Sequence, residues 1–392
     1  MRCGSFISDT RSPEREEYDR QRTSQCKRLL LAAAEECVGE VGFAGPHRER
    51  YHQGHVSVSL LEEYARCPWR VLTTRILGLK EDRELDGLLS GAEMGLVLHD
   101  VLRDYVKRAS EDGRWPPVAG QAETDSTLIA EMVRRRVADE YLGRATRFPA
   151  LERVDSRRAI ARLLGWLLWE ASDNGKKAED AGSWRLHTVE QSFETKLEIA
   201  GRSLKLRGRW DRIDRDTSDR FRIIDYKTGY GKPGPSADLE GGLNLQMPLY
   251  LMAAEKELDL SASTGSAGST RSAEPESSSG ALAGGILLRL PLSVSGQGPH
   301  ITSWPQQVME AGREEVEKLV DQLLNSIESG VFTRLPHDKA SDSRTDLCKG
   351  CPTPPICRAW RIQESQRHRK SDELRPLNVA RKIGVIGRHN DR

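Results

Sequence analysis

A run of residues near the middle of the chain places an acid and a base at the end of an apolar strand. Ile223 and Ile224 precede Asp225, and Lys227 follows two positions later. Side chains two positions apart on a strand share a face, so Asp225 and Lys227 are expected to project together. A surface salt bridge would explain this pair if it stood alone. Only other motifs in the chain, taken together with this pair, can favour an active site over that interpretation.

A second carboxylate lies on the segment just before this strand. Asp211 and Asp214 both stand where they could meet Asp225 across a strand pair. Two converging carboxylates repel each other unless a cation lies between them, and their oxygen atoms suit Mg²⁺ or Mn²⁺. Asp211 and Asp214 are three positions apart and face opposite ways, so only one can be a ligand. Lys227 would then orient the attacking water or help to remove its proton.

Two helical segments carry further candidates. His99 follows Gly95 by one turn, and the missing side chain at Gly95 would let the helix approach the strand ends closely. Gln246 and Tyr250 are likewise one turn apart on one helical face. The alternative interpretations are a core histidine, an ordinary exposed Gln and a packed Tyr.

Seven cysteines occur, and Cys348, Cys351 and Cys357 form a C-x2-C-x5-C pattern. Three thiolates can bind one zinc ion or one iron–sulfur cluster, provided that a fourth ligand comes from elsewhere. No export signal is recognisable, so metal binding is a better expectation than disulfide formation. The cysteines that fit no ligand pattern, and are expected to be ordinary thiols, are Cys3, Cys26 and Cys37.

The elements that position these residues follow from the hydrophobic periodicity. Helical spacing predicts helices near 59–72, 92–109, 125–142, 151–171, 243–258 and 306–329. Alternating apolar and polar residues predict a meander of strands at 188–199, 203–213 and 220–226, and 285–292 is read as a returning strand. A turn at Ala200 and Gly201 joins the first two strands, and Ser59 is a candidate N-cap for the first helix. This mixture predicts an α/β protein.

The composition narrows the class of protein. A chain of 392 residues with 37% hydrophobic residues can bury a sizeable core, and a formal net charge of +1 excludes a uniformly basic surface. The apolar stretch at 29–34 is interrupted by Glu35 and Glu36, so neither a signal peptide nor a membrane span is expected, and the protein should be cytoplasmic. The chain has no G-x-x-x-x-G-K-[ST] phosphate loop and therefore no motor of that type.

Taken in order, these motifs resemble the PD-(D/E)xK nuclease superfamily, and specifically its RecB-like branch with AddB-type nuclease domains. The resemblance extends from about Val56 to Trp360. It implies a restriction-endonuclease-like core, in which helices flank a central mixed β-sheet, with a helical N-terminal part. The segments that carry the resemblance are 59–70 with Cys67-Pro68-Trp69, 95–99, 208–211, 224–228, 246–250 and the closing cysteines.

The resemblance also implies a role for each candidate. His99, Asp211 and Asp225 would be metal ligands together with the backbone carbonyl of Tyr226, and Lys227 would be the catalytic lysine. Asp211 is preferred to Asp214 because it stands three residues after Gly208, as in the family pattern. Gln246 and Tyr250 would lie beside the lysine and the scissile phosphate, so the expected catalytic set is Asp211, Asp225, Lys227, Gln246 and Tyr250.

In the iron–sulfur members of this branch, one early cysteine joins three late ones around a 4Fe–4S cluster. By resemblance, Cys67 is that early ligand, and Cys348, Cys351 and Cys357 are the others. Zinc at the same thiolates is the alternative. The centre would staple the helix near Ser59 to the end of the nuclease fold, a closure that contributes on the order of 5 kcal/mol if the disulfide relation applies.

The expected domain organisation has three parts. Residues 1–55 form a partly helical appendage, residues 56–360 form the nuclease domain with a disordered insertion at 261–279, and residues 361–392 form a basic tail. From 358 onward ten Lys and Arg stand against four acids, so this region could contact phosphates. The arginine-rich helices between 131 and 162 are a second candidate for a DNA-facing wall, and a solvated surface is the alternative for both.

These observations predict a metal-dependent DNA nuclease, expected to be an exonuclease acting on single strands or duplex ends in recombination and double-strand-break repair. Its cofactors would be Mg²⁺ or Mn²⁺ and a 4Fe–4S cluster. The chain would be a free-standing nuclease, a subunit that works with a separate helicase, or the C-terminal part of a longer helicase–nuclease. The alternatives are a catalytically silent scaffold that binds DNA ends and a zinc-stapled interaction module.

Overall fold

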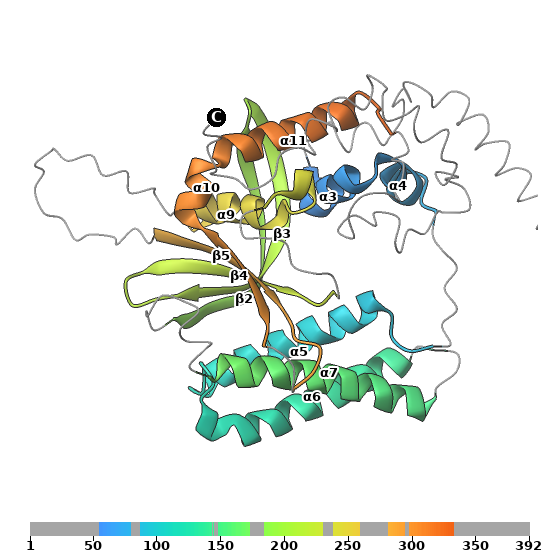
Figure 1. The fold of residues 1–392 in the computed structure, drawn as a ribbon, viewed down its shortest axis with the longest axis vertical. Coiled ribbons are helices and arrows are strands. Elements are labelled where there is room, and N and C mark those ends of the chain that lie inside the picture. Colours follow the sequence, from blue (N-terminus) through green and yellow to red (C-terminus); the bar gives the residue numbers. More distant parts are fainter. Residues whose placement is uncertain are drawn as a thin grey trace, which may run out of the picture.

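The structure is a computed structural model (Figure 1). The residues that it describes are 55–79, 87–142, 144, 148–172, 184–229, 238–258, 281–294 and 298–332. The expected appendage at 1–55 therefore lies outside the described residues except for His55, and the insertion at 261–279 and the tail at 361–392 lie wholly outside them. Among the described residues, no helix combines the length and the apolar character needed to cross a bilayer.

The centre of the molecule is a six-stranded mixed sheet with the order β1-β3-β4-β5-β6, in which β2 also pairs with β3. The β2–β3, β3–β4 and β5–β6 pairs are antiparallel, whereas β1–β3 and β4–β5 are parallel. The strands are β1 (His55–Ser57), β2 (Arg185–Ile199), β3 (Arg202–Arg215), β4 (Arg220–Lys227), β5 (Ala281–Arg289) and β6 (His300–Pro305).

Two helical layers cover the two faces of the sheet (Figure 1). One layer contains α3 (Val58–Arg66), α9 (Gln246–Glu257), α10 (Gln306–Ala311) and α11 (Arg313–Glu328). The other contains α5 (Gly91–Glu111), α6 (Ala122–Leu142) and α7 (Pro149–Glu170). The short helix α4 (Pro68–Val71) and a π-helical turn (Leu72–Ile76) follow α3. The mixed sheet between helices that the sequence predicts is present, and it is consistent with a restriction-endonuclease-like core.

The residues of β4 explain why the core has two halves. Ile223 and Trp210 pack with α3, α9 and α11, whereas Ile224 and Tyr226 pack with α5, α6 and α7. Because successive side chains on a strand point to opposite faces, a strand covered on both sides must be apolar at nearly every position. Residues 221–226 of β4 are all buried. Two charged residues, Arg222 and Asp225, lie within this run, and Asp225 stands at the end where the sheet approaches the candidate site.

Three helical boundaries differ from the sequence prediction. The N-cap of α3 is Ser57, whose hydroxyl accepts a hydrogen bond from the Leu60 amide, rather than Ser59. The helix predicted for 59–72 is interrupted at Cys67, whose extended backbone separates α3 from α4. The helix predicted for 306–329 divides at Gly312 into α10 and α11. Glycine lowers helix stability, so an interruption there is physically reasonable.

The strands near the C-terminal half also differ. β5 covers 281–289, so it begins four residues and ends three residues before the predicted 285–292. It ends earlier because Pro291 and Leu292 follow the ladder rather than join it. Apolar periodicity did not reveal β1 or β6, which contain three and six residues. Strands this short carry too few alternations to be recognised.

Candidate metal centre

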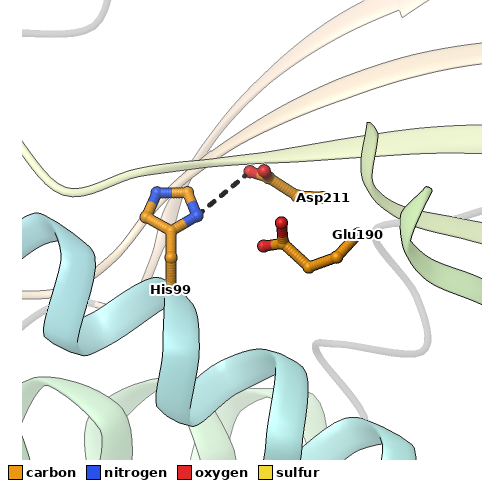
Figure 2. A group of neighbouring side chains, drawn as sticks. All are labelled: His99, Glu190 and Asp211. Carbon is orange, nitrogen blue, oxygen red and sulfur yellow. Dashed lines mark ion pairs between the residues drawn. The ribbon is translucent and has the colours of Figure 1, made fainter. Parts of the chain in front are cut away.

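Three potential ligands converge at one end of the sheet. His99 projects from α5, Glu190 from β2 and Asp211 from β3, and one ligand atom from each lies within 4.8 Å of the others (Figure 2). His99 Nδ1 forms an ion pair of 3.4 Å with Asp211 Oδ2. All three side chains are partly buried. One imidazole and two carboxylates therefore face a common point, although they come from segments far apart in the sequence.

Asp211 is positioned by the end of the β3–β4 ladder. The last pair of that ladder joins Arg212 to Ile224. Beyond it, the Asp211 side chain takes the place of a backbone partner, and its Oδ2 accepts a hydrogen bond of 2.8 Å from the Tyr226 amide. This bond fixes the carboxylate between the two strands. Tyr226 thus lies at the site through its backbone, while its side chain packs in the α5–α7 core.

Asp225 and Lys227 project together, and a glutamine joins them. Lys227 Nζ lies 2.6 Å from Asp225 Oδ2, and Gln246 Nε2 donates a 2.6 Å hydrogen bond to Asp225 Oδ1. Lys227 Nζ also donates to Gln246 Oε1. The amide of Gln246 therefore holds the acid and the base at once. Asp225, which the sequence predicted as a ligand, is not among the three tightly grouped residues, and Lys227 and Gln246 engage its two oxygen atoms.

Glu62 of α3 holds the helix that carries Gln246. Its Oε1 accepts hydrogen bonds of 2.9 Å from the amides of Leu245 and Gln246, at the N-terminus of α9. No side chain from α9 or its N-cap residue makes such a capping bond. An acid at this end also interacts favourably with the helix dipole. Burial raises the pKa of Glu62 to about 7, although the charge of Lys227 opposes this shift.

Tyr250, one turn after Gln246, lies against a glycine of β3. A Cβ on Gly208 would lie 2.5 Å from the Phe193 ring and 2.9 Å from the Tyr250 ring. The Phe193 and Tyr250 rings meet edge to face, with centroids 5.2 Å apart. Only glycine leaves room for this packing. Gly208 thereby lets α9 lie close to the strand that carries Asp211.

Gly95 has the corresponding role on the opposite face. A Cβ at this position would lie 3.0 Å from Thr228 Oγ1, just beyond the end of β4. The missing side chain therefore permits α5 to approach the strand end. His99 follows one turn later, on the side of α5 that faces the sheet (Figure 2). The helix begins with a capping box in which Ser90 and Glu93 exchange hydrogen bonds, and this fixes its first turn.

The electrostatics of the site favour a bound cation. Burial and the charge of Asp211 raise the pKa of Glu190, and burial raises the pKa of Asp225 even though Lys227 opposes the shift. Burial alone would lower the pKa of His99, but the hydrogen bond and charge of Asp211 raise it. Together, the shifts reflect burial and crowded negative charge. A divalent cation would neutralise that charge, and the nitrogen and oxygen donors suit Mg²⁺ or Mn²⁺.

Glu190 is the site residue that the sequence interpretation missed. The ladder pairs Val189 with Arg212 and Gln191 with Trp210, so Glu190 and Asp211 lie between these pairs, opposite each other. The sequence could have revealed Glu190. In a hairpin whose turn is centred between Ala200 and Gly201, the residue opposite position 211 is position 190. Glu190 also has a positive φ of 51°, an uncommon conformation for a residue other than glycine. Its Oε2 is 2.6 Å from Arg209 Nε.

Asp214, the rival of Asp211, lies in a different environment. It is fully buried and accepts hydrogen bonds from Arg212 at 2.6 and 2.7 Å and from Arg222 at 2.7 and 3.0 Å. Arg212 also donates to Glu170 of α7. These bonds occupy the Asp214 carboxylate within the protein. The geometry therefore favours Asp211 at the metal centre and a structural role for Asp214.

Of the four cysteines assigned to a cluster, the structure describes one. Cys67 is half-buried at the junction of α3 and α4 and packs against the core. Cys348, Cys351 and Cys357 lie outside the described residues. The fold therefore provides no geometry for the iron–sulfur centre.

The sequence matches the family model described as the PD-(D/E)XK nuclease superfamily over residues 55–358. Curated relatives named as subunits of an ATP-dependent helicase/deoxyribonuclease include one from Alkaliphilus metalliredigens, 25% identical over 246 residues that cover 60% of this chain and 21% of the relative. The relative from Moorella thermoacetica is 28% identical over 215 residues, which cover 51% and 17% of the two chains. The chain thus matches about a fifth of the length of these relatives.

Proposed function

Because the chain belongs to the PD-(D/E)XK nuclease superfamily, we propose that it is a DNA nuclease that hydrolyses phosphodiester bonds with Mg²⁺ or Mn²⁺. The observation that carries this proposal is the convergence of His99, Glu190 and Asp211 beside the Asp225–Lys227 pair. Clustered acids with a lysine are the groups that metal-assisted hydrolysis requires. Cleavage from a DNA end, as an exonuclease, is the form of the reaction that we propose.

His99, Asp211 and Asp225 would hold the ion together with the Tyr226 carbonyl, and Glu190 is an additional ligand. When bound, the ion would act as a Lewis acid that activates water and neutralises charge on the phosphate. Asp211 is already oriented by the Tyr226 amide, and His99 by Asp211. Asp225 is held by Gln246. These contacts restrict the side chains before any ligand arrives, which reduces the entropy lost on binding.

Lys227 is suited to orient a water molecule rather than to take a proton from it. Burial would lower its pKa, but the charge and hydrogen bond of Asp225 and the charge of Glu62 raise it above the ordinary value. An ammonium donates hydrogen bonds and accepts none. Lys227 would therefore direct the attacking oxygen and stabilise negative charge on the phosphate, while Gln246 fixes its position.

The proposal is tested with purified protein and DNA labelled at the 5′ or 3′ end, single-stranded or duplex, in Mg²⁺, Mn²⁺ or EDTA. The wild type should cleave only with a metal ion, and the labelled products give the direction of cleavage. Asp225→Ala and Lys227→Ala should each lower the rate by about a hundredfold to a thousandfold, as loss of a charge-stabilising group in an active site does. Glu198→Gln, on the exposed side of β2, serves as the matched control.

Two results would contradict parts of this proposal. Unchanged cleavage by a folded Lys227→Ala protein would remove the assigned role of the lysine. DNA binding by the wild type without cleavage in either metal would indicate the scaffold alternative, in which the centre does not turn over. The distinction is direct, because binding and cleavage are measured on the same labelled DNA.

A helicase partner is also proposed. The similar relatives are named as helicase/deoxyribonuclease subunits, and the chain matches only a part of them. Nuclease activity in recombination and double-strand-break repair, supplied with single strands by a separate helicase or by helicase domains in the same polypeptide, would account for this similarity. A stimulation of cleavage by a helicase and ATP would support this role.

A 4Fe–4S cluster bound by Cys67, Cys348, Cys351 and Cys357 is proposed on the spacing of the cysteines. The position of Cys67 supports this proposal, because the residue lies at a break between two helices and is partly accessible. Zinc at the same four thiolates remains the alternative. The colour of the purified protein distinguishes the two.

A further inference from the structure

Three basic residues lie in register across neighbouring strands at the end of the sheet. Lys227 of β4 pairs with Arg289 of β5, and Arg289 pairs with His300 of β6. Residues paired across neighbouring strands project from the same face of the sheet. The row begins at the candidate centre with Lys227 and continues away from it through Arg289 to the exposed His300. We call Lys227, Arg289 and His300 the basic row.

Arg289 lacks the carboxylate partner that several arginines of the fold have. Arg212 and Arg222 are both paired with Asp214, and Arg114 is paired with Asp125. Within the described part of the chain, no carboxylate forms an ion pair with Arg289, and its buried Nε has no hydrogen-bond partner. To the described residues, its side chain makes one hydrogen bond, from Nη1 to the Gly229 carbonyl at 2.8 Å. Burial accordingly lowers the pKa of Arg289.

A partly buried cation without a counterion carries a desolvation cost that an anion would remove. The neighbour of Arg289 in the row, Lys227, is itself positively charged, and its own charge is balanced by Asp225. Like charges in neighbouring cross-strand positions are destabilising unless an anion joins them. The basic row is therefore arranged to receive negative charge from outside the described protein.

The described residues leave room beside Gly229, next to the Arg289 guanidinium. Among these residues, only Arg289 Nη1 lies within 4 Å of a Cβ placed on Gly229, at 3.5 Å. The side chain is partly exposed. Within the described part of the chain, an incoming group can therefore approach the guanidinium from the side of Gly229. Guanidinium groups bind phosphate oxygens through paired hydrogen bonds, which makes a phosphodiester the ligand class that fits this position.

We infer that Arg289, assisted by His300, binds a backbone phosphate of the DNA strand next to the phosphate that is cleaved. This inference rests on the proposed function, because it places the rest of the same strand along the basic row. Contacts to phosphates fix the register of a nucleic acid on a protein without reading its sequence. Arg289 would thus set which linkage enters the metal centre.

The test measures binding of a fluorescent single-stranded oligonucleotide in EDTA, where no cleavage occurs, at several salt concentrations. Arg289→Gln should weaken binding by about tenfold, the effect of one lost hydrogen bond to a charged group. The logarithm of the binding constant decreases linearly as the logarithm of the salt concentration rises. Arg289→Gln should make this slope shallower by about 0.7, the value for one phosphate contact on a single strand. Lys318→Gln, an equal charge change on the exposed side of α11, should do neither.

A second measurement uses oligonucleotides with one neutral methylphosphonate at each linkage in turn. Neutralising the linkage beside the cleaved one should weaken binding by the wild type but not by Arg289→Gln, because the contact is then already lost. Arg289→Met, which keeps the aliphatic length, replaces the Gln variant if that protein unfolds. Unfolding of both variants would show that Arg289 is structural and would overturn the inference.

The outcomes separate this inference from the proposed function. Equal affinity and equal salt slope for the wild type and Arg289→Gln would overturn the role of Arg289, while metal-dependent cleavage would still support the nuclease. A wild type that binds no DNA at all would count against both. A loss of affinity that Lys318→Gln reproduces would indicate a general charge effect, and the inference would then be wrong.

Discussion

At the scale of single residues, the candidate centre combines groups that repel one another. Glu190 and Asp211 face each other across two strands, and Asp225 is close enough to raise the pKa of His99. Such an arrangement costs free energy in the absence of a cation, since like charges in cross-strand pairs are destabilising. Replacing one of these carboxylates should therefore raise the free energy of unfolding but lower the nuclease activity, as expected for groups placed for chemistry rather than for folding.

Glu190→Gln tests this opposition. Without metal, the variant should unfold at a slightly higher urea concentration than the wild type, by about 0.5 kcal/mol, because the repulsion with Asp211 is removed. With metal, it should need about tenfold more Mn²⁺ for half-maximal cleavage, because one carboxylate ligand is lost. Unfolding in EDTA and a Mn²⁺ titration measure the two effects. Glu198→Gln on the same strand should change neither, and an unaltered Mn²⁺ requirement for Glu190→Gln would exclude Glu190 as a ligand.

The raised pKa of the Glu62 carboxyl group should make the free energy of unfolding depend on pH in a specific way. Its pKa rises from an ordinary 4.5 to about 7 in the folded protein. Between these values the folded state holds more protons than the unfolded state, so the free energy of unfolding decreases as the pH rises from about 4.5 to about 7. Glu62→Gln should remove this component, while Glu63→Gln, at a surface ion pair with Arg75, should keep it. Urea unfolding in EDTA at pH 5 and pH 7.5 measures the difference.

At the scale of elements, the centre depends on how closely two helices approach the sheet from opposite sides. Gly95 lets α5 approach the end of β4, and Gly208 lets Tyr250 of α9 lie over β3. The two helices carry His99 and Gln246, which must reach the same strand ends. Effective metal and water chemistry requires positioning within a fraction of an ångström, so a small displacement of either helix should have a large effect.

Gly95→Ala tests whether the position of α5, rather than the stability of the helix, controls cleavage. Alanine is favoured over glycine inside a helix by about 1 kcal/mol, but the new Cβ would lie 3.0 Å from Thr228 Oγ1 and should displace the helix. We expect cleavage to decrease by about tenfold or more, with little change in the thermal midpoint. Gly91→Ala, earlier on α5 with nothing within 4 Å, is the control. Equal activity of Gly95→Ala and the wild type would show that the close approach is not required.

At the scale of the whole molecule, α3 links the N-terminal segment to the centre of the fold. It carries Glu62, which caps α9, and it ends at Cys67, the proposed first ligand of the cluster. Tyr64 donates a hydrogen bond to the carbonyl of Val331, shortly before the described residues end. The last described segment, 298–332, therefore contacts the first one, 55–79, at α3. A cluster joining Cys67 to the later cysteines would reinforce a contact that the described fold already makes.

Cys67→Ser tests the proposed cluster. The wild type should be brown, whereas the variant should lose this colour and unfold at a lower temperature, because the closure of a very long loop is lost. Cys26→Ser, which removes a cysteine outside the ligand pattern, should keep both properties. Absorption spectra, iron analysis and thermal unfolding measure these outcomes. A colourless wild type that contains one zinc ion per chain would favour the zinc alternative.

The sequence alone determined the features that depend on local periodicity and on residue types. The β2–β3–β4 meander, the helices of both layers and the α/β class follow from apolar spacing, because that spacing must match the surface that each element buries. The pairing of Asp225 with Lys227 follows from the period of two on a strand. The predicted turn at Ala200 and Gly201 also implies that position 190 lies opposite Asp211, although the sequence interpretation did not name Glu190.

Only the tertiary structure decided the features that depend on long-range contacts. The resemblance already favours Asp211 over Asp214. Only the packed fold shows that Asp211 meets His99 of α5, and that Arg222 of the neighbouring strand helps to enclose Asp214. The capping of α9 by Glu62 joins residues more than 180 positions apart. A linear pattern records the side chain but not its partner, because the partner is set by packing across the whole fold.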